Sequence, residues 1–295
     1  MNYALDALWW RLTDPNVRDL ASLLTAPPLW LSGCELPVRE LLGEQGFRYL
    51  LALDENPAPL QAHLQQEAPF AHRLGFYAES LLAFWLQTAP HAQLHARNLV
   101  INDENGATLG ALDFVADLNG QTHHIELTCK YYGDKQGRPS EMVGLNRSDR
   151  LADKAAKLQQ QLAWSAQTAG QAALQAAGIN PQAIRRVSIV RGIGFAAANA
   201  AWCSAPLNRH GWHGRYLEAA QAWPLSESLS PQADSQTRYY PLPPMHLLAP
   251  ARVPPVYALT AEALNEVAYG QVAQLELRPD GYWHEVARMM KGRMA

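Results

Sequence analysis

The stretch HHIELTCKYYGDK, residues 123–135, places three polar side chains on one face of a predicted strand. Side chains alternate along a strand, so Glu126, Thr128 and Lys130 share one face and the apolar residues between them share the other. An acid, a hydroxyl and an amine in a row are costly to bury unless each has a partner. The apolar face is predicted to enter the core, and the polar face to be an exposed edge or a functional surface.

Two further acids occupy positions that are unusual for their type. Asp113 lies inside the predicted strand ATLGALDFVADL, where aspartate is disfavoured. Glu79 lies on the apolar face of the predicted helix RLGFYAESLLAFWLQTAP, where an unpaired carboxylate is costly. Asp113 is either an ordinary residue of a half-solvated sheet or a site residue. Glu79 either extends from the margin of its face to water or is directed into a cleft.

The strands that carry Asp113, Glu126 and Lys130 are joined by the turn DLNG, so these residues can be neighbours across a sheet. Converging carboxylates bind Mg²⁺ or Mn²⁺, because these ions prefer oxygen ligands. Such an ion activates water for in-line attack on a phosphate, and a lysine stabilises the negative charge that develops. We therefore predict an active site for Mg²⁺-dependent phosphodiester hydrolysis, in which Asp113 and Glu126 bind the metal and Lys130 is catalytic.

A basic helix is predicted after the polar loop that follows this strand, in NRSDRLADKAAKLQQQLAWSAQTAG, residues 146–170. Arg150, Lys154, Lys157 and Gln161 follow one another at spacings of four, three and four, which places them in one stripe. The sequence from residue 130 to residue 157 holds seven basic and four acidic residues, a net charge of +3. The stripe is predicted to bind nucleic acid, most naturally DNA. An ordinary solvated helix face is the alternative.

The elements that position these residues predict an α/β fold with three regions. Residues 1–72 have the pattern of short helices separated by prolines. Residues 73–195 predict a helix, three strands, a helix and a strand, an αβββαβ core whose hairpin turns are DENG and DLNG. Residues 196–295 are rich in proline and end in a predicted β-hairpin around RPDG, packed on the core.

The order of the elements and acids resembles the PD-(D/E)XK nuclease core. The chain is also similar to an uncharacterised bacterial family placed in that superfamily, over VRDLASLLTAPPL, RLGFYAESLLAFWL, GALDFVADLNG, HIELTCKYY, DRLADKAAKLQQQL, VRGIGF and DGYWHEVAR. This resemblance covers most of the chain and implies a restriction-endonuclease-like core. In the superfamily the acid stands two residues before the lysine, which here is Thr128. Glu126 stands four before it, about 13 Å along an ideal strand, and Glu79 could supply the missing metal ligand.

Other function classes are disfavoured by the composition. The formal net charge is −3, which argues against attraction of the whole protein to nucleic acid or anionic membranes. The three cysteines are far apart and form no CxxC pair, which disfavours a disulfide framework and a cysteine zinc site. The sequence shows neither a signal peptide nor an apolar run of about 20 residues. We therefore predict a cytoplasmic protein without a membrane segment.

Three other patterns have plainer interpretations. GIGFAA, residues 192–197, fits G-x-G-x-x-A after a strand, but no acid follows about 20 residues on, so its glycines are attributed to packing. His210 and His213 lie in a glycine-flanked loop and are not assigned to a metal. His124 shares the face of Glu126 and is either a proton carrier near the site or a residue at the start of a strand.

The alternative to a nuclease is a non-catalytic nucleic-acid- or protein-binding module with the same fold, which would show no Mg²⁺- or Mn²⁺-dependent thermal shift.

Overall fold

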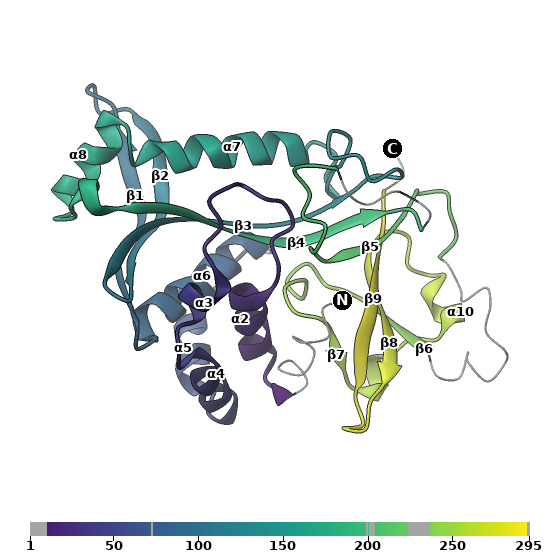
Figure 1. Cartoon of the computed structure of the whole chain (residues 1–295). Coiled ribbons are helices and arrows are strands. Elements are labelled where there is room, and N and C mark those ends of the chain that lie inside the picture. The colour runs from purple at the N-terminus through teal and green to yellow at the C-terminus, as the bar shows by residue number, and fades with distance from the viewer. Residues whose placement is uncertain (1–10, 72, 199, 201–203, 224–236, 294–295) are drawn as a thin grey trace.

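The computed structural model describes residues 11–71, 73–198, 200, 204–223 and 237–293. Over these residues the chain is a mixed α/β protein in which helices pack on both faces of one large mixed sheet (Figure 1). The nine strands of this sheet follow the order β1-β2-β3-β4-β5-β9-β8-β6, and β7 pairs with β9. No helix within the described ranges is long and apolar enough to cross a bilayer.

Short helices form the N-terminal part, as the prolines of this region predict. They are α2 (Pro15–Thr25), α3 (Val38–Leu42), α4 (Gly46–Glu55) and α5 (Ala58–Glu67). Helix α2 begins where the Asp14 carboxylate accepts hydrogen bonds from the backbone N–H groups of Asn16 and Val17. Pro15 occupies the first turn, where its missing N–H costs nothing. The buried leucines of α2 then pack into the main core.

The middle of the chain follows the predicted order of helix, three strands, helix and strand, with one additional helix. Its elements are α6 (Leu74–Thr88), β1 (Ala92–Asn102), β2 (Thr108–Leu118), β3 (Gln121–Gly133), α7 (Leu151–Trp164), α8 (Thr168–Ala176), the 3₁₀ helix η1 (Pro181–Ala183) and β4 (Arg185–Ala196). The single helix predicted for residues 146–170 is wrong at both ends, since the structure has α7, a turn and the start of α8. Gly170 makes the turn possible because a Cβ there would lie 2.0 Å from the carbonyl oxygen of Trp164.

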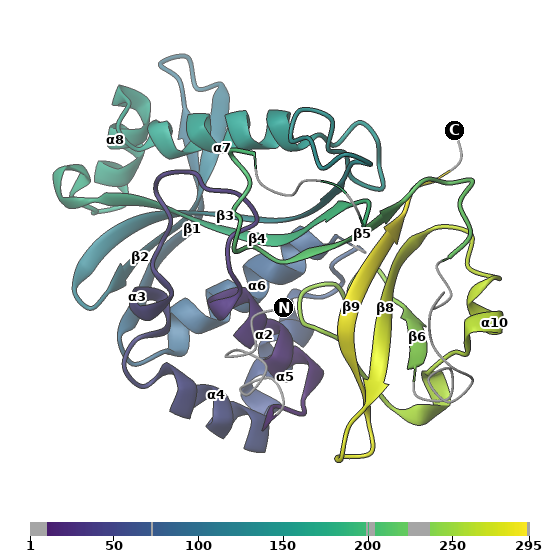
Figure 2. The ribbon, with the colours of Figure 1, turned by 45° about the vertical axis from the view of Figure 1, so that its right-hand side comes forward.

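The sheet changes from antiparallel to parallel pairing at β3. Strands β1, β2 and β3 are antiparallel neighbours, and β3 pairs in parallel with β4. The remaining elements are β5 (His213–Leu217), β6 (Thr237–Pro241), β7 (Arg252–Val253), the 3₁₀ helix η2 (Pro255–Tyr257), α10 (Ala261–Leu264), β8 (Gly270–Leu277) and β9 (Trp283–Lys291). Parallel pairing of β4 with β5 and of β5 with β9 carries the sheet into the C-terminal part (Figure 2). The predicted terminal hairpin is β8 and β9.

The two faces of β3 have the distribution that the alternation predicts. Ile125 and Leu127 belong to the main core with α2 and α6, and Cys129 is half-buried against it. Glu126 and the other even-numbered residues face the opposite side, which helix α7 covers (Figure 1). The polar face of β3 is therefore enclosed between the sheet and α7, and each of its polar groups needs a partner or a ligand.

Candidate active site

The candidate site lies where strands β2 and β3 separate. A two-residue turn joins them, and Asn119 and Gly120 both have positive φ, as the tightest hairpins require. This turn fixes a register that runs from Leu118 opposite Gln121 to Phe114 opposite Ile125 and ends there. Beyond that pair, β2 continues along β1 while β3 continues along β4.

Asp113 and Glu126 are the first residues past the last paired position, so they are opposite each other at the fork. The backbone N–H of Asp113 approaches Glu126 Oε1 at 3.4 Å. The backbone N–H of Leu127 donates to Asp113 Oδ2 at 2.9 Å. Each carboxylate therefore accepts a hydrogen bond from a backbone N–H group that does not take part in the pairing of β2 with β3. The structure brings these two acids together, as the sequence predicted.

Glu126 is 1 % exposed and is held by side chains from β3 and α7. Its Oε1 lies 2.7 Å from His124 Nε2, and its Oε2 accepts a hydrogen bond from Gln161 Nε2 at 2.8 Å. The other ring nitrogen of His124 lies 2.9 Å from the hydroxyl of Ser165, in the turn after α7. Gln161, predicted as part of the nucleic-acid-binding stripe, is instead buried as a partner of Glu126, and His124 is a second direct partner, which the sequence left open.

The protonation of the pair follows from its burial. Burial, together with the neighbouring charge of Glu126, raises the pKa of Asp113 to about 7. Burial also raises the pKa of Glu126 to about 7. Burial lowers the pKa of His124 to about 4, so its ring is neutral near neutral pH. The two carboxyl groups together then hold about one proton.

Glu79 approaches the fork from α6 and does not join the pair. It is half-buried, and its pKa is raised by burial and by the charge of Asp113, while Arg97 and a hydrogen bond with Asn98 act in the opposite direction. Over the described part of the chain, no group of three or more His, Cys, Asp or Glu side chains is arranged to hold a metal ion. Asp113 and Glu126 alone still suit Mg²⁺, which is commonly held by one or two carboxylates together with waters and substrate phosphates.

Two lysines lie on this side of the sheet, and they have different partners. Lys130 Nζ lies 2.6 Å from Asp149 Oδ2, and Asp149 Oδ1 accepts a hydrogen bond from the hydroxyl of Tyr132 at 2.9 Å. Lys154 on α7 is half-buried, and the charge of Asp113 is the main influence that raises its pKa against the lowering effect of burial. The carboxylate pair therefore feels the charge of Lys154, while Lys130 is paired with the loop before α7.

The residues of the basic stripe on α7 differ in their exposure to solvent. Arg150 and Lys157 are exposed, and Arg150 donates to the backbone oxygen of Ser140 at 3.1 Å. Lys154 is half-buried and Gln161 is buried against Glu126. The stripe thus has two exposed cations, one half-buried lysine and a buried amide that contacts Glu126.

Three features of the site were not assigned from the sequence. Asp149 lies in a polar loop without periodicity, so nothing in the sequence linked it to Lys130. The ring of His124 shares the face of Glu126, and that alternation is the signal that indicated it. Thr128 stands where the superfamily has its acid, is 3 % exposed, and its hydroxyl has no hydrogen-bond partner among the described residues.

Comparison with known proteins identifies a family. The model of the family described as "Domain of unknown function (DUF1853)" matches residues 18–290 of the chain. No curated protein and no solved structure matches it. The matched range contains every candidate residue of the fork and of α7.

Proposed function

We propose that this chain, which belongs to the family described as "Domain of unknown function (DUF1853)", is a Mg²⁺- or Mn²⁺-dependent nuclease. It would hydrolyse phosphodiester bonds, with DNA as the expected substrate. The observation that carries this proposal is the fork of β2 and β3, where the buried Glu126 and the half-buried Asp113 lie together beside a basic helix. The order α6, β1, β2, β3, α7, β4 supports a PD-(D/E)XK-like core.

Asp113 and Glu126 are the residues that would hold the cation. Both have raised pKa values, so they must release the proton that they hold near neutral pH before they bind a divalent ion with full charge. Glu79 would add negative potential from α6 without being a direct ligand. The ion, when bound, would lower the pKa of a water molecule and stabilise charge on the phosphate.

The remaining residues would position the acids and the substrate. His124 and Gln161 fix the orientation of Glu126 through hydrogen bonds to its two oxygens. Lys154 is placed to stabilise negative charge that develops on the phosphate beside the pair. Lys130, on the same face of β3 as Glu126, would orient the substrate at the rim of the site. The exposed Arg150 and Lys157 would bind phosphates further along the strand.

A non-catalytic binding module with the same fold is the second candidate. It is favoured by the hydrogen bonds and the ion pair that the site residues already make with neighbouring side chains. Both oxygens of Glu126 accept hydrogen bonds, and Lys130 is paired with Asp149. Such a protein would bind nucleic acid through the basic stripe of α7 and cut nothing.

Cleavage assays separate the two candidates. The purified protein is incubated with single-stranded DNA, double-stranded DNA or RNA in the presence of Mg²⁺ or Mn²⁺. We expect the wild type to cut at least one substrate, and Asp113→Asn, Glu126→Gln and Lys154→Met each to lose roughly a hundredfold or more of the rate. Lys157→Met removes an exposed lysine one turn away that is assigned to phosphate binding, so it should weaken substrate binding but keep most of the rate at saturating substrate.

The outcomes have distinct meanings. Binding without cutting in all wild-type reactions would establish the binding module and reject the nuclease. Cutting that persists unchanged in Asp113→Asn and Glu126→Gln would come from a contaminant and would also reject it. An equal loss in Lys154→Met and Lys157→Met would show that the helix contributes only general affinity for phosphate.

A further inference from the structure

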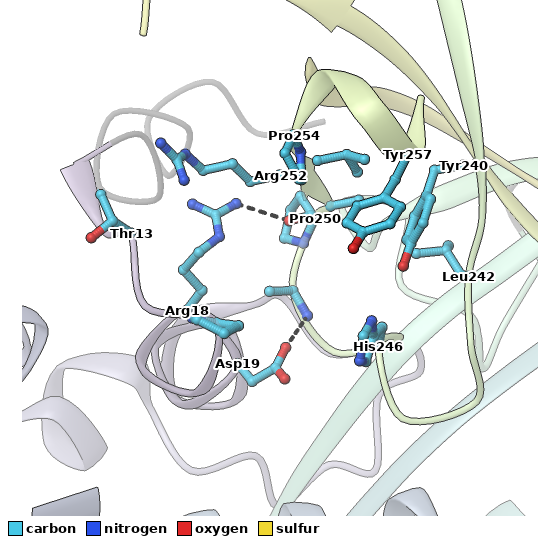
Figure 3. Close-up of a pocket in the computed structure, with 14 residues that line it drawn as sticks. Thr13, Arg18, Asp19, Tyr240, Leu242, His246, Pro250, Arg252, Pro254 and Tyr257 are labelled. Atoms are coloured by element: carbon cyan, nitrogen blue, oxygen red, sulfur yellow. Dashed lines mark hydrogen bonds between the residues drawn. The ribbon is translucent and has the colours of Figure 1, made fainter. Parts of the chain in front are cut away.

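A cavity of about 290 Å³ lies away from the fork, between the start of α2 and the segment that runs from β6 to η2 (Figure 3). Its lining includes Arg18 and Asp19 on α2, Arg252 on β7, and the rings of Tyr240 and Tyr257. None of these residues belongs to the proposed nuclease site. The cavity is therefore a separate candidate for a binding site.

The walls of the cavity are held together by hydrogen bonds between distant parts of the chain. Arg18 Nη2 donates to the carbonyl oxygen of Pro250 at 2.9 Å, and the backbone N–H of Ala249 donates to Asp19 Oδ1 at 3.0 Å (Figure 3). One turn further along α2, the hydroxyl of Ser22 donates to the carbonyl oxygen of Leu248 at 2.7 Å. The cavity is thus formed before any ligand arrives, which reduces the entropy that binding costs.

The lining combines an aromatic side with a cationic side. Figure 3 shows Tyr240 and Tyr257 close together on one side and the guanidinium groups of Arg18 and Arg252 on the other. Neither phenol hydroxyl has a hydrogen-bond partner within the described ranges. Prolines, Leu242 and other apolar residues form much of the remaining surface. A mostly apolar cavity with a few convergent polar groups is typical of a small-molecule site.

The guanidinium groups of the lining are the groups that would recognise an anion, although Asp280, outside the lining, also pairs with Arg252. Two arginines line it against one acid, Asp19, which is already engaged by Ala249 and by the hydroxyl of Tyr77. Arg252 is fixed in place because its guanidinium lies 3.4 Å from the centre of the Tyr282 ring and its Nε lies 3.1 Å from Asp280 Oδ2. A carboxylate or phosphate is the group that arginine recognises best.

The volume limits the ligand to a small molecule. A cavity of about 290 Å³ lies at the lower end of the size range of small-molecule sites. That is room for one aromatic ring with a short substituent. A ring would also find favourable contact with the faces or edges of two tyrosines.

We propose that this cavity binds a small aromatic anion, a single ring that bears a carboxylate or a phosphate. The ring lies against Tyr240 and Tyr257, and the anionic group is directed toward Arg18 and Arg252. This binding does not depend on the nuclease reaction, so its test does not use cleavage as a readout.

The test uses 4-hydroxybenzoate and phenyl phosphate as probes, which separates the carboxylate from the phosphate source. Binding to the full chain is measured by saturation-transfer NMR and isothermal titration calorimetry near neutral pH. The neutral 4-hydroxybenzamide and the non-aromatic cyclohexanecarboxylate are the matched controls for charge and for the ring. We expect millimolar or tighter binding of at least one probe, and binding roughly tenfold weaker for both controls.

Two variants connect the binding to the cavity. Tyr257→Ala removes a ring that is 60 % exposed, so the fold should persist while probe binding weakens severalfold. Arg252→Met removes one cation and should weaken binding of the two anionic probes but not binding of the neutral 4-hydroxybenzamide. Val256→Ala, at a neighbouring residue that is 80 % exposed and outside the lining, should bind as the wild type does. Absence of binding by both probes at millimolar concentration, binding equal to that of the amide, or binding unchanged in both lining variants would overturn the proposal.

Discussion

The Asp113 carboxyl keeps its proton in the folded protein to a pH well above that at which an exposed aspartate loses it. Its folded pKa is about 7, against an ordinary value of 3.8. The folded state therefore holds a proton that the unfolded state has released between about pH 4 and pH 7. The stabilisation that this proton gives to the folded state is complete below about pH 4 and is lost as the pH rises through 7. Without a bound cation, the site should thus destabilise the fold at alkaline pH.

Asp113→Asn should remove this cost. The amide oxygen can still accept from the backbone N–H of Leu127, and the amide carries no charge at any pH. We expect the variant to exceed the wild type by about 4 kcal/mol in free energy of unfolding at pH 8 and to come close to it near pH 4. Urea unfolding across this range measures the difference. A constant gap at all pH values would show that ionisation of Asp113 is not the cause.

The pairing of Asp113 with Glu126 could be predicted, whereas the partners of the lysines could not. A two-residue Asn-Gly turn fixes the register of its strands, and that register places these two acids opposite each other. The partner of Lys130 comes from a loop, where no repeat links residue positions to directions in space. For the same reason, the sequence indicated Lys130 as the catalytic lysine. In the structure Lys130 is paired with Asp149, and the charges of Asp113 and Glu126 act on the pKa of Lys154.

The pairing of β3 with β4 depends on a glycine beside the site. Gly192 has φ +133°, and a Cβ there would lie 1.6 Å from the carbonyl oxygen of Lys130. The glycines of GIGFAA therefore have a packing role at this position, which agrees with the interpretation that the sequence favoured. The same close approach holds β4 against the part of β3 that carries Lys130.

Gly192→Ala should consequently disrupt the middle of the sheet. We expect a loss of at least about 2 kcal/mol in free energy of unfolding, because the substitution combines a strained φ with a backbone clash. Gly75→Ala is the control: this residue lies in α6, a methyl group there would meet no atom within 4 Å, and alanine should stabilise by up to about 1 kcal/mol. A Gly192→Ala protein as stable as the wild type would contradict the close contact of β3 and β4.

The break between α7 and α8 shows why element boundaries were harder to predict than element types. The sequence from residue 151 to residue 176 is rich in alanine and glutamine and contains no proline. Its helical pattern is continuous, so nothing in it marks the turn at Ser165. The turn is a consequence of tertiary contacts, since Ser165 meets His124 and Gly170 packs on the backbone of Trp164.

The three regions predicted from the sequence share one hydrophobic core. Leucines of α2, the apolar face of α6, Ile125 of β3 and Met290 of β9 all belong to the same buried cluster. The C-terminal strands were predicted only at the final hairpin, because β5 and β6 have five residues each and their partners are distant in sequence. Short strands carry too little alternation to be recognised alone.

A fragment of residues 73–195 should therefore fail to fold independently. It would expose the apolar face of α6 that packs on α2 and would leave β4 without β5. We expect urea unfolding of the fragment, followed by circular dichroism, to show no cooperative transition, in contrast to the full chain. A sharp transition with native-like helix content would establish residues 73–195 as an autonomous domain.

We propose that Asp113 and Glu126 hold a divalent cation, so Mn²⁺ should bind at the fork of β2 and β3. Calorimetric titrations near pH 7 in two buffers of different ionisation enthalpy report both the affinity and the protons released. We predict millimolar or tighter binding with release of a large part of one proton, because the cation displaces the proton that the pair holds. In Asp113→Asn, affinity should fall by about tenfold or more and proton release should largely disappear. No Mn²⁺ binding by the wild type, or the same affinity and proton release in Asp113→Asn, would contradict the account.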